Sequence, residues 1–295
     1  MPVSARGAKI FFILILLLSG LRAQADGDEG DCTRLESSLK RDVEFLSDSL
    51  CCGRKTGSQG ANEAAFYIIR RLVNLGYDVQ TKSFSTPGDA VGHNILAGSI
   101  DGKKPAILLM AYYDGLGKMG GRLYPGADSN GSGAAALLAI AEKLKERSDV
   151  IIAFVDGHNA NMAGSEALAA LLAKRPLRMV VNLDILGSSL APPDKFWKNY
   201  LIILGGSTYQ RSFDKLNSGK TLHLYYNYYN SRSFTDLFYR KVGDQKPFFS
   251  RGVPVLMFTS GITLNTNREG DTSETLDYPV FAERVSLITR WLQAL

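Results

Sequence analysis

The sequence predicts an α/β fold in which a mostly parallel central sheet carries helices on both faces and antiparallel strands at its edge. Three observations lead to this prediction. Continuous apolar runs of strand length recur along the chain, helical segments separate them, and two earlier segments alternate between polar and apolar residues. Parallel strands buried on both faces are apolar throughout, whereas half-buried strands alternate.

The N-terminus has the pattern of a secretory signal peptide over residues 1–25. Two basic residues precede the apolar run Ile10–Leu18, and Ala23-Gln24-Ala25 supplies a small-x-small cleavage pattern. The run is short for a membrane anchor, which remains the alternative. We therefore expect a secreted or periplasmic protein in which residues 26–295 form a single domain.

The charge of the mature chain argues against two classes of partner. The whole chain has 34 basic and 29 acidic residues, and removal of Arg6, Lys9 and Arg22 with the signal peptide leaves 31 against 29. Such a balance predicts no nucleic-acid partner and no membrane partner after cleavage. It leaves the oligomeric state open.

The three cysteines lie close together near the mature N-terminus. A helix from Cys32 to Ser49 would place Cys32 and Cys51 roughly 27 Å apart, at 1.5 Å per residue. That separation is too large for a disulfide. We expect free thiols, and the spacing of Cys32, Cys51 and Cys52 matches no zinc site.

The first elements follow from periodicity and from turn residues. Cys32–Asp48 repeats apolar residues at helical spacing, and Ala61–Leu75 is a second helix that stops at Gly76. Tyr77–Phe84 and Asn94–Ile100 are the predicted antiparallel edge strands.

From residue 106 onward the pattern alternates between strand and helix. The predicted strands are Ala106–Ala111, Val150–Val155, Met179–Leu183, Leu201–Leu204 and Val253–Thr259. The predicted helices are Gly133–Lys145, Ser165–Ala173, Tyr209–Leu216 and Val280–Leu295. The tyrosine-rich run Tyr225–Tyr229 fits either the wall of a ligand groove or partner surface, or a strand with one half-buried aromatic face.

Polar residues follow the predicted buried strands at their carboxyl ends. Open α/β sheets place their ligands at this edge. The segments that we expect to meet there contain Asp114, Asp128-Ser129-Asn130, Asp156 with His158 and Asn159, Asn182 with Asp184, and Asn267 with Asp271. Taken singly, each fits a helix cap or a turn, so their convergence is the evidence for a site.

The same segments carry framework motifs. These are Gly53-Arg54-Lys55-Thr56-Gly57-Ser58, Gly126-Ala127-Asp128, Ser132-Gly133, Gly164-Ser165, Asn182-Leu183-Asp184, Gly187, Asp244, Pro247-Phe248, Gly252-Val253-Pro254 and Asp271-Thr272. From about Asp42 to the C-terminus the chain resembles the secreted zinc exopeptidases, which include bacterial leucyl aminopeptidases, glutaminyl cyclases and transferrin-receptor-like proteins. The resemblance implies that residues 26–295 are one zinc-peptidase-like domain.

Working members of that family hold two zinc ions through a His, a bridging Asp, a Glu, an Asp and a final His, and a further Glu is the general base. The resemblance places a residue of another type at four of the five ligand positions, and one position keeps the residue type of the family. The ligand positions are occupied by Tyr112, Ser129, Asn159, Asp184 and Asn267. The base position falls on His158, the neighbouring Asp114 and Asp128 are kept, and Gln245 replaces a downstream histidine.

These substitutions predict a catalytically inactive homologue with a binding or accessory role and no zinc. The chain has three histidines, and neither His93 nor His223 is placed to replace a lost ligand. A zinc site needs about four ligands drawn mainly from His, Cys and carboxylate side chains. We expect no catalytic residue, no metal ligand and no cofactor, and we expect a peptide or protein as the ligand.

Two active alternatives remain from the sequence. In the first, a weak single metal near Asp184, held with His158 and Asp128, supports an aminopeptidase-like or glutaminyl-cyclase-like reaction. In the second, Ser129, His158 and Asp184 are nucleophile, base and orienting acid. The second requires a hydrogen bond between Ser129 and His158.

Overall fold

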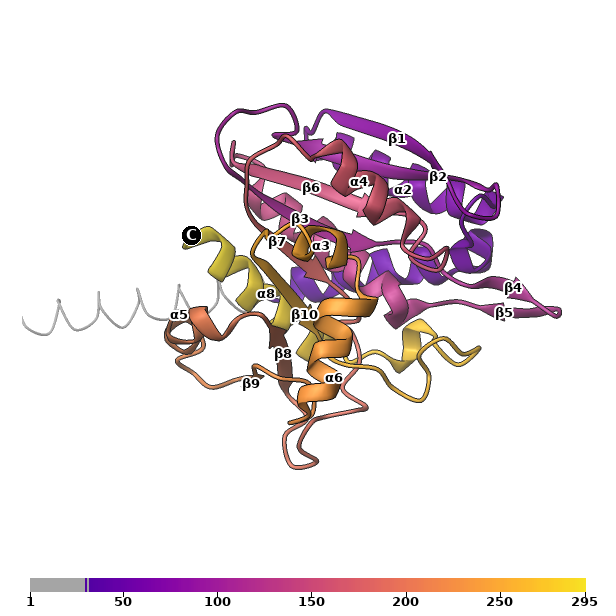
Figure 1. Ribbon diagram of the computed structural model, residues 1–295. Helices are drawn as coiled ribbons and strands as arrows, with labels where there is room; N and C mark the ends of the chain where they lie inside the picture. Colours follow the sequence, from indigo (N-terminus) through magenta and orange to yellow (C-terminus); the bar gives the residue numbers. More distant parts are fainter. Residues whose placement is uncertain (1–29, 31) are drawn as a thin grey trace, which may run out of the picture.

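The structure is a computed structural model that describes residue 30 and residues 32–295. The predicted signal peptide lies outside the described residues. In order across its main sheet, the strands are β1 (Val79–Ser85), β2 (Val91–Gly98), β6 (Val150–Val155), β3 (Ala106–Tyr112), β7 (Leu177–Leu183), β10 (Val255–Thr259), β8 (Tyr200–Leu204) and β9 (His223–Tyr225) (Figure 1). A separate hairpin joins β4 (Gly117–Met119) and β5 (Arg122–Tyr124).

The four central strands β6, β3, β7 and β10 are parallel. β1 and β2 pair antiparallel at one edge, and β2 runs antiparallel to β6. At the other edge β8 is antiparallel to β10, and β9 is parallel to β8. Every residue of β3 and β6 is buried, whereas β1 alternates between exposed and half-buried. The predicted fold class is confirmed.

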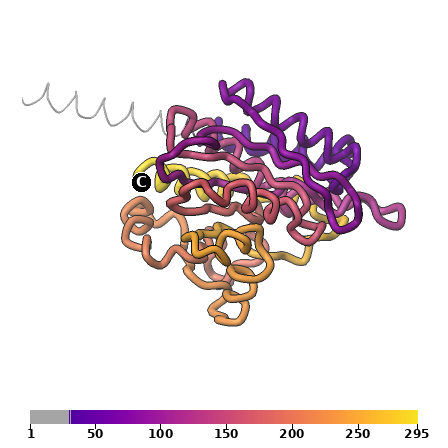
Figure 2. Tube along the Cα trace, turned by 45° about the horizontal axis from the view of Figure 1, so that its top comes forward, coloured from indigo at the N-terminus to yellow at the C-terminus, as the bar shows by residue number. Residues whose placement is uncertain are grey.

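Helices cover both faces of the sheet (Figures 1 and 2). One face packs against residues 32–47, α2, α3, α5 and α8, and the other packs against α4 and α7. The helices are α2 (Gln59–Asn74), α3 (Gly133–Leu144), α4 (Ala163–Leu171), α5 (Gln210–Leu216), α6 (Arg232–Leu237), α7 (Lys246–Phe249) and α8 (Tyr278–Gln293). Short helical turns are η1 (Ser49–Arg54), η2 (Ala127–Ser132), η3 (Ser207–Tyr209), η4 (Phe238–Val242) and η5 (Ser273–Thr275).

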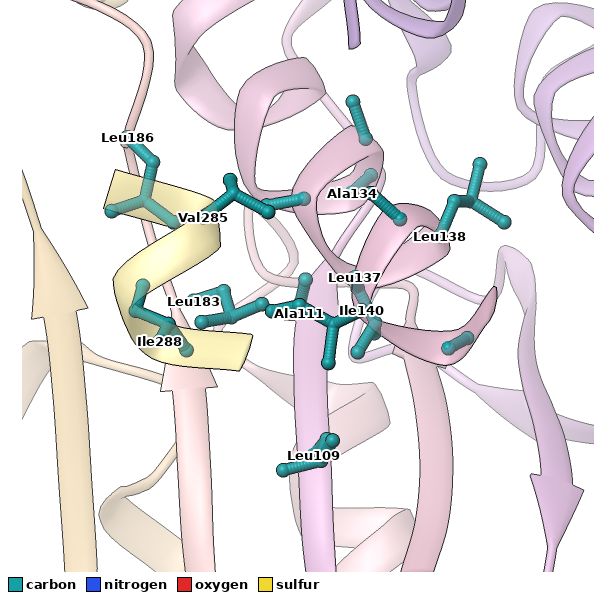
Figure 3. Packing of buried hydrophobic residues seen from close by; sticks show 14 of the residues in the cluster. Leu109, Ala111, Ala134, Leu137, Leu138, Ile140, Leu183, Leu186, Val285 and Ile288 are labelled. Atoms are coloured by element: carbon teal, nitrogen blue, oxygen red, sulfur yellow. The ribbon is translucent and has the colours of Figure 1, made fainter. Parts of the chain in front are cut away.

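The larger core lies between the sheet and the helices α3 and α8. Figure 3 shows Leu109 and Ala111 of β3 facing Leu137 and Ile140 of α3, with Ile288 of α8 beside them. These side chains have no solvent exposure. Burial of each large aliphatic side chain contributes about 1.5–3 kcal/mol, so this layer fixes the carboxyl ends of the central strands in place.

Two glycines let the chain turn sharply after β6. Gly157 has φ of +77°, a conformation that other residues rarely adopt. A Cβ atom on Gly164 would lie 2.0 Å from the carbonyl oxygen of Asp156, so only glycine allows α4 to begin this close to the strand. The loop between them carries His158 and Asn159.

Cys32, Cys51 and Cys52 are free, as the sequence predicts. Within residues 32–295, no helix combines the length and apolar character that a membrane crossing requires. Figures 1 and 2 show the segment between β8 and β10 (orange) at the end of the molecule opposite β1 and β2 (violet).

Candidate functional site

A cavity of about 410 Å³ lies at the carboxyl ends of the central strands. Four of the residues predicted from the sequence line it, namely Tyr112, His158, Asp184 and Asn267. They come from the end of β3, the loop after β6, the end of β7 and the loop after β10. The convergence of these four segments, which the sequence predicts from the polar residues at the carboxyl ends of the strands, is present in the structure.

His158 forms an ion pair that the sequence does not predict. Its Nδ1 lies 2.6 Å from Oδ2 of Asp244, which comes from the segment between η4 and α7 and has no solvent exposure. The imidazole ring stacks on the Tyr112 ring with centroids 3.8 Å apart and an interplanar angle of 8°. Hydrogen bond and stacking together fix the orientation of the imidazole.

The carboxylates around His158 favour its protonated form. Burial alone would lower the pKa of His158, but the adjacent Asp244, aided by Asp184 and Asp114, raises it to about 9. The side chain is 23% exposed, so it reaches the cavity while remaining mostly out of solvent. At neutral pH these carboxylates therefore favour the imidazolium form of His158, which the resemblance places at the base position.

Asp114 holds the loop after β6 through its fully buried carboxylate. Oδ1 accepts the backbone N–H of His158 at 2.8 Å, and Oδ2 accepts the backbone N–H of Asn159 at 2.9 Å. The Asn159 side-chain amide also donates to Oδ2, at 3.1 Å. Burial raises the pKa of Asp114, although these bonds and His158 counteract it. Asp114 thus positions the loop, and it accepts a hydrogen bond from the side-chain amide of Asn159.

Asp184 is the residue that the sequence resemblance places at a kept ligand position. It is 7% exposed, lines the cavity, and its carboxylate accepts no hydrogen bond from the described residues. Burial raises the pKa of Asp184 to about 6, and the nearby His158 opposes that rise. Burial thus weakens the preference of Asp184 for its ionised form, and its carboxylate lines the cavity.

The loop that contains Ser129 is bonded within itself and to the loop after β10. Ser129 donates its hydroxyl to Oδ1 of Asn267 at 3.2 Å, and the backbone N–H groups of Asp128 and Ser129 donate to Asp271. Asp128 accepts from Ser132 and from the backbone of Gly187. Burial, followed by the charge of Asp271, raises the pKa of Asp128 to about 7.

Gln245 is fully buried and does not line the cavity. Its Oε1 accepts from Asn182 at 2.8 Å, and its Nε2 donates to the carbonyls of Phe238 and Tyr239. Gln245 therefore ties η4 to the end of β7. This glutamine, which the resemblance places where relatives have a histidine, is a structural bridge.

Most of the cavity wall was missed by sequence reasoning. The wall residues not singled out are Ile185, Leu237, Phe238, Val242, Met257, Ile262, Thr263 and Thr266. Most of them are apolar and have the same sequence signature as core residues. Tyr228, in the tyrosine-rich run, is also a wall residue and stacks on Phe238 with centroids 4.5 Å apart. Within that run only Tyr225 belongs to a strand, β9.

The residues present do not fit a zinc site. Within residues 32–295, no three His, Cys, Asp or Glu side chains are grouped so that they could hold a metal ion. Asp128 directs one oxygen to Ser132 and Gly187 and is not in the cavity wall, so it does not join Asp184 and His158. Nδ1 of His158 is occupied by Asp244. The donor set falls short of the four ligands that zinc needs.

The hydrogen bonds also differ from those of a Ser-His-Asp triad. Ser129 donates to Asn267, and His158 pairs with Asp244 in place of Asp184. Among the described residues, no hydrogen bond joins Ser129 to His158. The nucleophile and the base of this alternative are therefore not connected.

Comparisons with known proteins place the chain in a family. Residues 94–291 match the model of peptidase family M28. The chain covers 73% of the LapA aminopeptidase of Legionella pneumophila, 98% of the glutaminyl cyclase of Porphyromonas gingivalis and 94% of the zinc aminopeptidase BSAP of Bacillus subtilis. Each alignment spans 88% of this chain, with TM-scores of 0.67, 0.67 and 0.68 and identities of 13%, 18% and 13%.

No curated protein sequence matches the chain significantly. The structural likenesses, at such low identity, show a shared fold, and the family model covers about two thirds of the sequence. The resemblance stated from the sequence motifs is confirmed. The chain belongs to peptidase family M28.

Proposed function

We propose that this protein is a secreted member of the family that binds a ligand in the inherited pocket without hydrolysing it. The observation that carries the proposal is the set of bonds made by the substituted residues. Ser129 bonds to Asn267, and Asn159 bonds to Asp114. The resemblance places Ser129, Asn159 and Asn267 at positions where relatives hold metal. These polar groups satisfy one another and leave no open set of metal ligands.

The chemistry of a two-metal peptidase depends on groups that this pocket lacks. Two metals polarise the scissile carbonyl and lower the pKa of a bound water, while a carboxylate general base moves the proton. Here the base position is His158, whose Nδ1 already pairs with Asp244. An imidazolium held by a carboxylate donates a hydrogen bond, so it supports binding of an acceptor group and does not support proton abstraction.

The remaining pocket suits a ligand with both polar and apolar parts. Asp184 and His158 are the charged groups in its wall, and Tyr228, Phe238 and Met257 provide apolar surface. Ligand pockets combine a mostly apolar wall with a few oriented polar groups in this way. A peptide or protein segment, or a fragment of one, has this combination.

The test combines metal binding with activity. Protein freed of metal by a chelator would be titrated with zinc by calorimetry, and hydrolysis of aminoacyl substrates and cyclisation of glutaminyl peptides would be measured with and without zinc. We expect no binding at micromolar zinc and no activity that a chelator abolishes. Zinc binding with chelator-sensitive turnover, both lost in Asp184→Asn, would overturn the proposal in favour of a single-metal enzyme.

A further inference from the structure

The outer face of α2 carries exposed apolar side chains that no described element covers. Phe66 and Val73 are 62% and 53% exposed, and Ile69 between them is half-buried. Their spacing of three and then four residues places the three side chains on one stripe along the helix. α2 packs on β1 and β2, at one end of the main sheet (Figure 1). The stripe therefore lies at the edge of the molecule, and none of its residues lines the inherited pocket.

The stripe is not needed to hold α2 on its own domain. The helix already buries a separate inner face, which contains Ala61, Ala64, Ile68 and Leu72. A helix that packs against a core needs one apolar face, and its other face is normally polar. A second apolar stripe on such a helix is the kind of surface that a partner covers.

The stripe is symmetric about its own centre, which lies between positions 67 and 68. Phe66 and Ile69 are equally far from this centre, and so are Asn62 and Val73, the next two exposed positions outward. Two antiparallel copies of α2, related by a two-fold axis at the centre, therefore bring Phe66 of each chain against Ile69 of the other. The surface is thus complementary to itself.

Two charged residues complement each other under the same symmetry. Glu63 and Arg70 are seven residues apart and flank the stripe on one side. Arg70 lies over the ring of Tyr67 in its own helix and, like Glu63, forms no ion pair with a described residue. In an antiparallel pair of helices, Glu63 of one chain lies beside Arg70 of the other, and the two-fold axis repeats this pair.

We propose that two copies of this chain form a dimer through the outer faces of their α2 helices, which run antiparallel across a two-fold axis. A closed dimer uses the same patch on both subunits, as this symmetric stripe allows. The nearly balanced charge of the chain adds little repulsion between the copies. The dimer leaves both inherited pockets accessible, because no residue of α2 lines them.

The length of α2 sets the expected strength of the association. Its 16 residues span about 24 Å at 1.5 Å per residue. A contact along one pair of such helices is at the low end of the roughly 1,200–2,000 Å² that stable interfaces bury. We therefore expect a dissociation constant on the order of 10 µM.

The experiment is sedimentation equilibrium of the purified mature chain between about 1 and 200 µM, where we expect a change from monomer to dimer. Phe66→Gln should weaken the association at least about tenfold, because the contact with Ile69 occurs twice. Phe196→Gln is the matched control. Phe196 is 74% exposed in the segment between β7 and β8, so its loss should leave the association unchanged.

Exchange of charges tests the antiparallel arrangement. Glu63→Arg places like charges together at both symmetric positions and should weaken the association at least about fivefold, as should Arg70→Glu. An equimolar mixture of these two variants should regain the wild-type association, because each chain then supplies the charge that the other needs. Glu166→Arg, at an exposed position of α4, is the control and should associate as the wild type does.

A monomer at every concentration would overturn the proposal, and so would a dimer that Phe66→Gln leaves intact. Two charge variants that stay monomeric when mixed would overturn the antiparallel arrangement. These measurements require neither ligand nor metal. Their failure would therefore leave the proposed function intact, and zinc-dependent turnover would refute that function without affecting the dimer.

Discussion

Replacement of His158 by glutamine should remove a pH-dependent part of the protein's stability. The ordinary pKa of 6.5 for histidine is raised to about 9 in the folded chain, chiefly by Asp244 at 2.6 Å. The folded state therefore binds this proton more tightly than the unfolded state. The resulting stabilisation is fully present below about pH 6.5 and is lost as the pH rises through about 9.

The size of the effect follows from the two pKa values. The interval from 6.5 to about 9, at 1.36 kcal/mol for each pKa unit, corresponds to about 3 kcal/mol. Between about pH 6 and pH 9.5 the free energy of unfolding of the wild type should fall by about 3 kcal/mol more than that of His158→Gln. Glutamine is close in size to histidine and does not titrate, so the difference isolates the imidazole.

The assay is urea denaturation of both proteins across this pH range, with the free energy of unfolding extrapolated to water. Titratable groups distant from His158 are common to both proteins and cancel in the difference. His223→Gln is the control and should keep the wild-type dependence. A wild type and a His158→Gln variant with the same pH dependence would refute the ion pair with Asp244.

Three further predictions concern the framework and the lost metal site. Asp114→Ala should lower the free energy of unfolding by about 2–4 kcal/mol in urea, because it leaves the backbone N–H groups of His158 and Asn159 without an acceptor. Arg54→Met should cost at least about 3 kcal/mol in the same assay, because Arg54 donates to four buried carbonyls, whereas Arg232→Met on the surface should change stability by less than about 0.5 kcal/mol. A variant with the family's ligands restored should bind micromolar zinc by calorimetry where the wild type does not; its changes are Tyr112→His, Ser129→Asp, Asn159→Glu and Asn267→His. Zinc binding by the wild type, or none by the restored variant, would contradict this reasoning.

The sheet could be predicted because its strands are distinctive locally. β3 and β6 are apolar along their whole length, and each has the bounds expected from the sequence within one residue. α6 and the β4–β5 hairpin were missed, since both are short and have no apolar periodicity. Strands buried on both faces need apolar residues along their whole length, so they leave a continuous apolar pattern in the sequence. Short exposed elements leave no such pattern, because they depend on contacts with other parts of the chain.

The position of the site could also be predicted, but its internal bonds could not. Strand order brings Tyr112, His158 and Asp184 to one edge, and the cavity lies there. The pairing of His158 with Asp244 joins residues 86 positions apart, on loops whose paths no local pattern determines. A sequence can therefore indicate which side chains meet at this edge, while the choice of partner depends on angstrom-scale loop geometry.

The substitutions in this pocket are consistent with one electrostatic requirement. Carboxylates gathered around one point repel one another unless a cation lies between them, and relatives meet that need with metal ions. Here Asp114, Asp184 and Asp244 remain, and each contributes to the raised pKa of His158. The other ligand positions hold neutral residues. His158 is thus the cation around which these carboxylates gather.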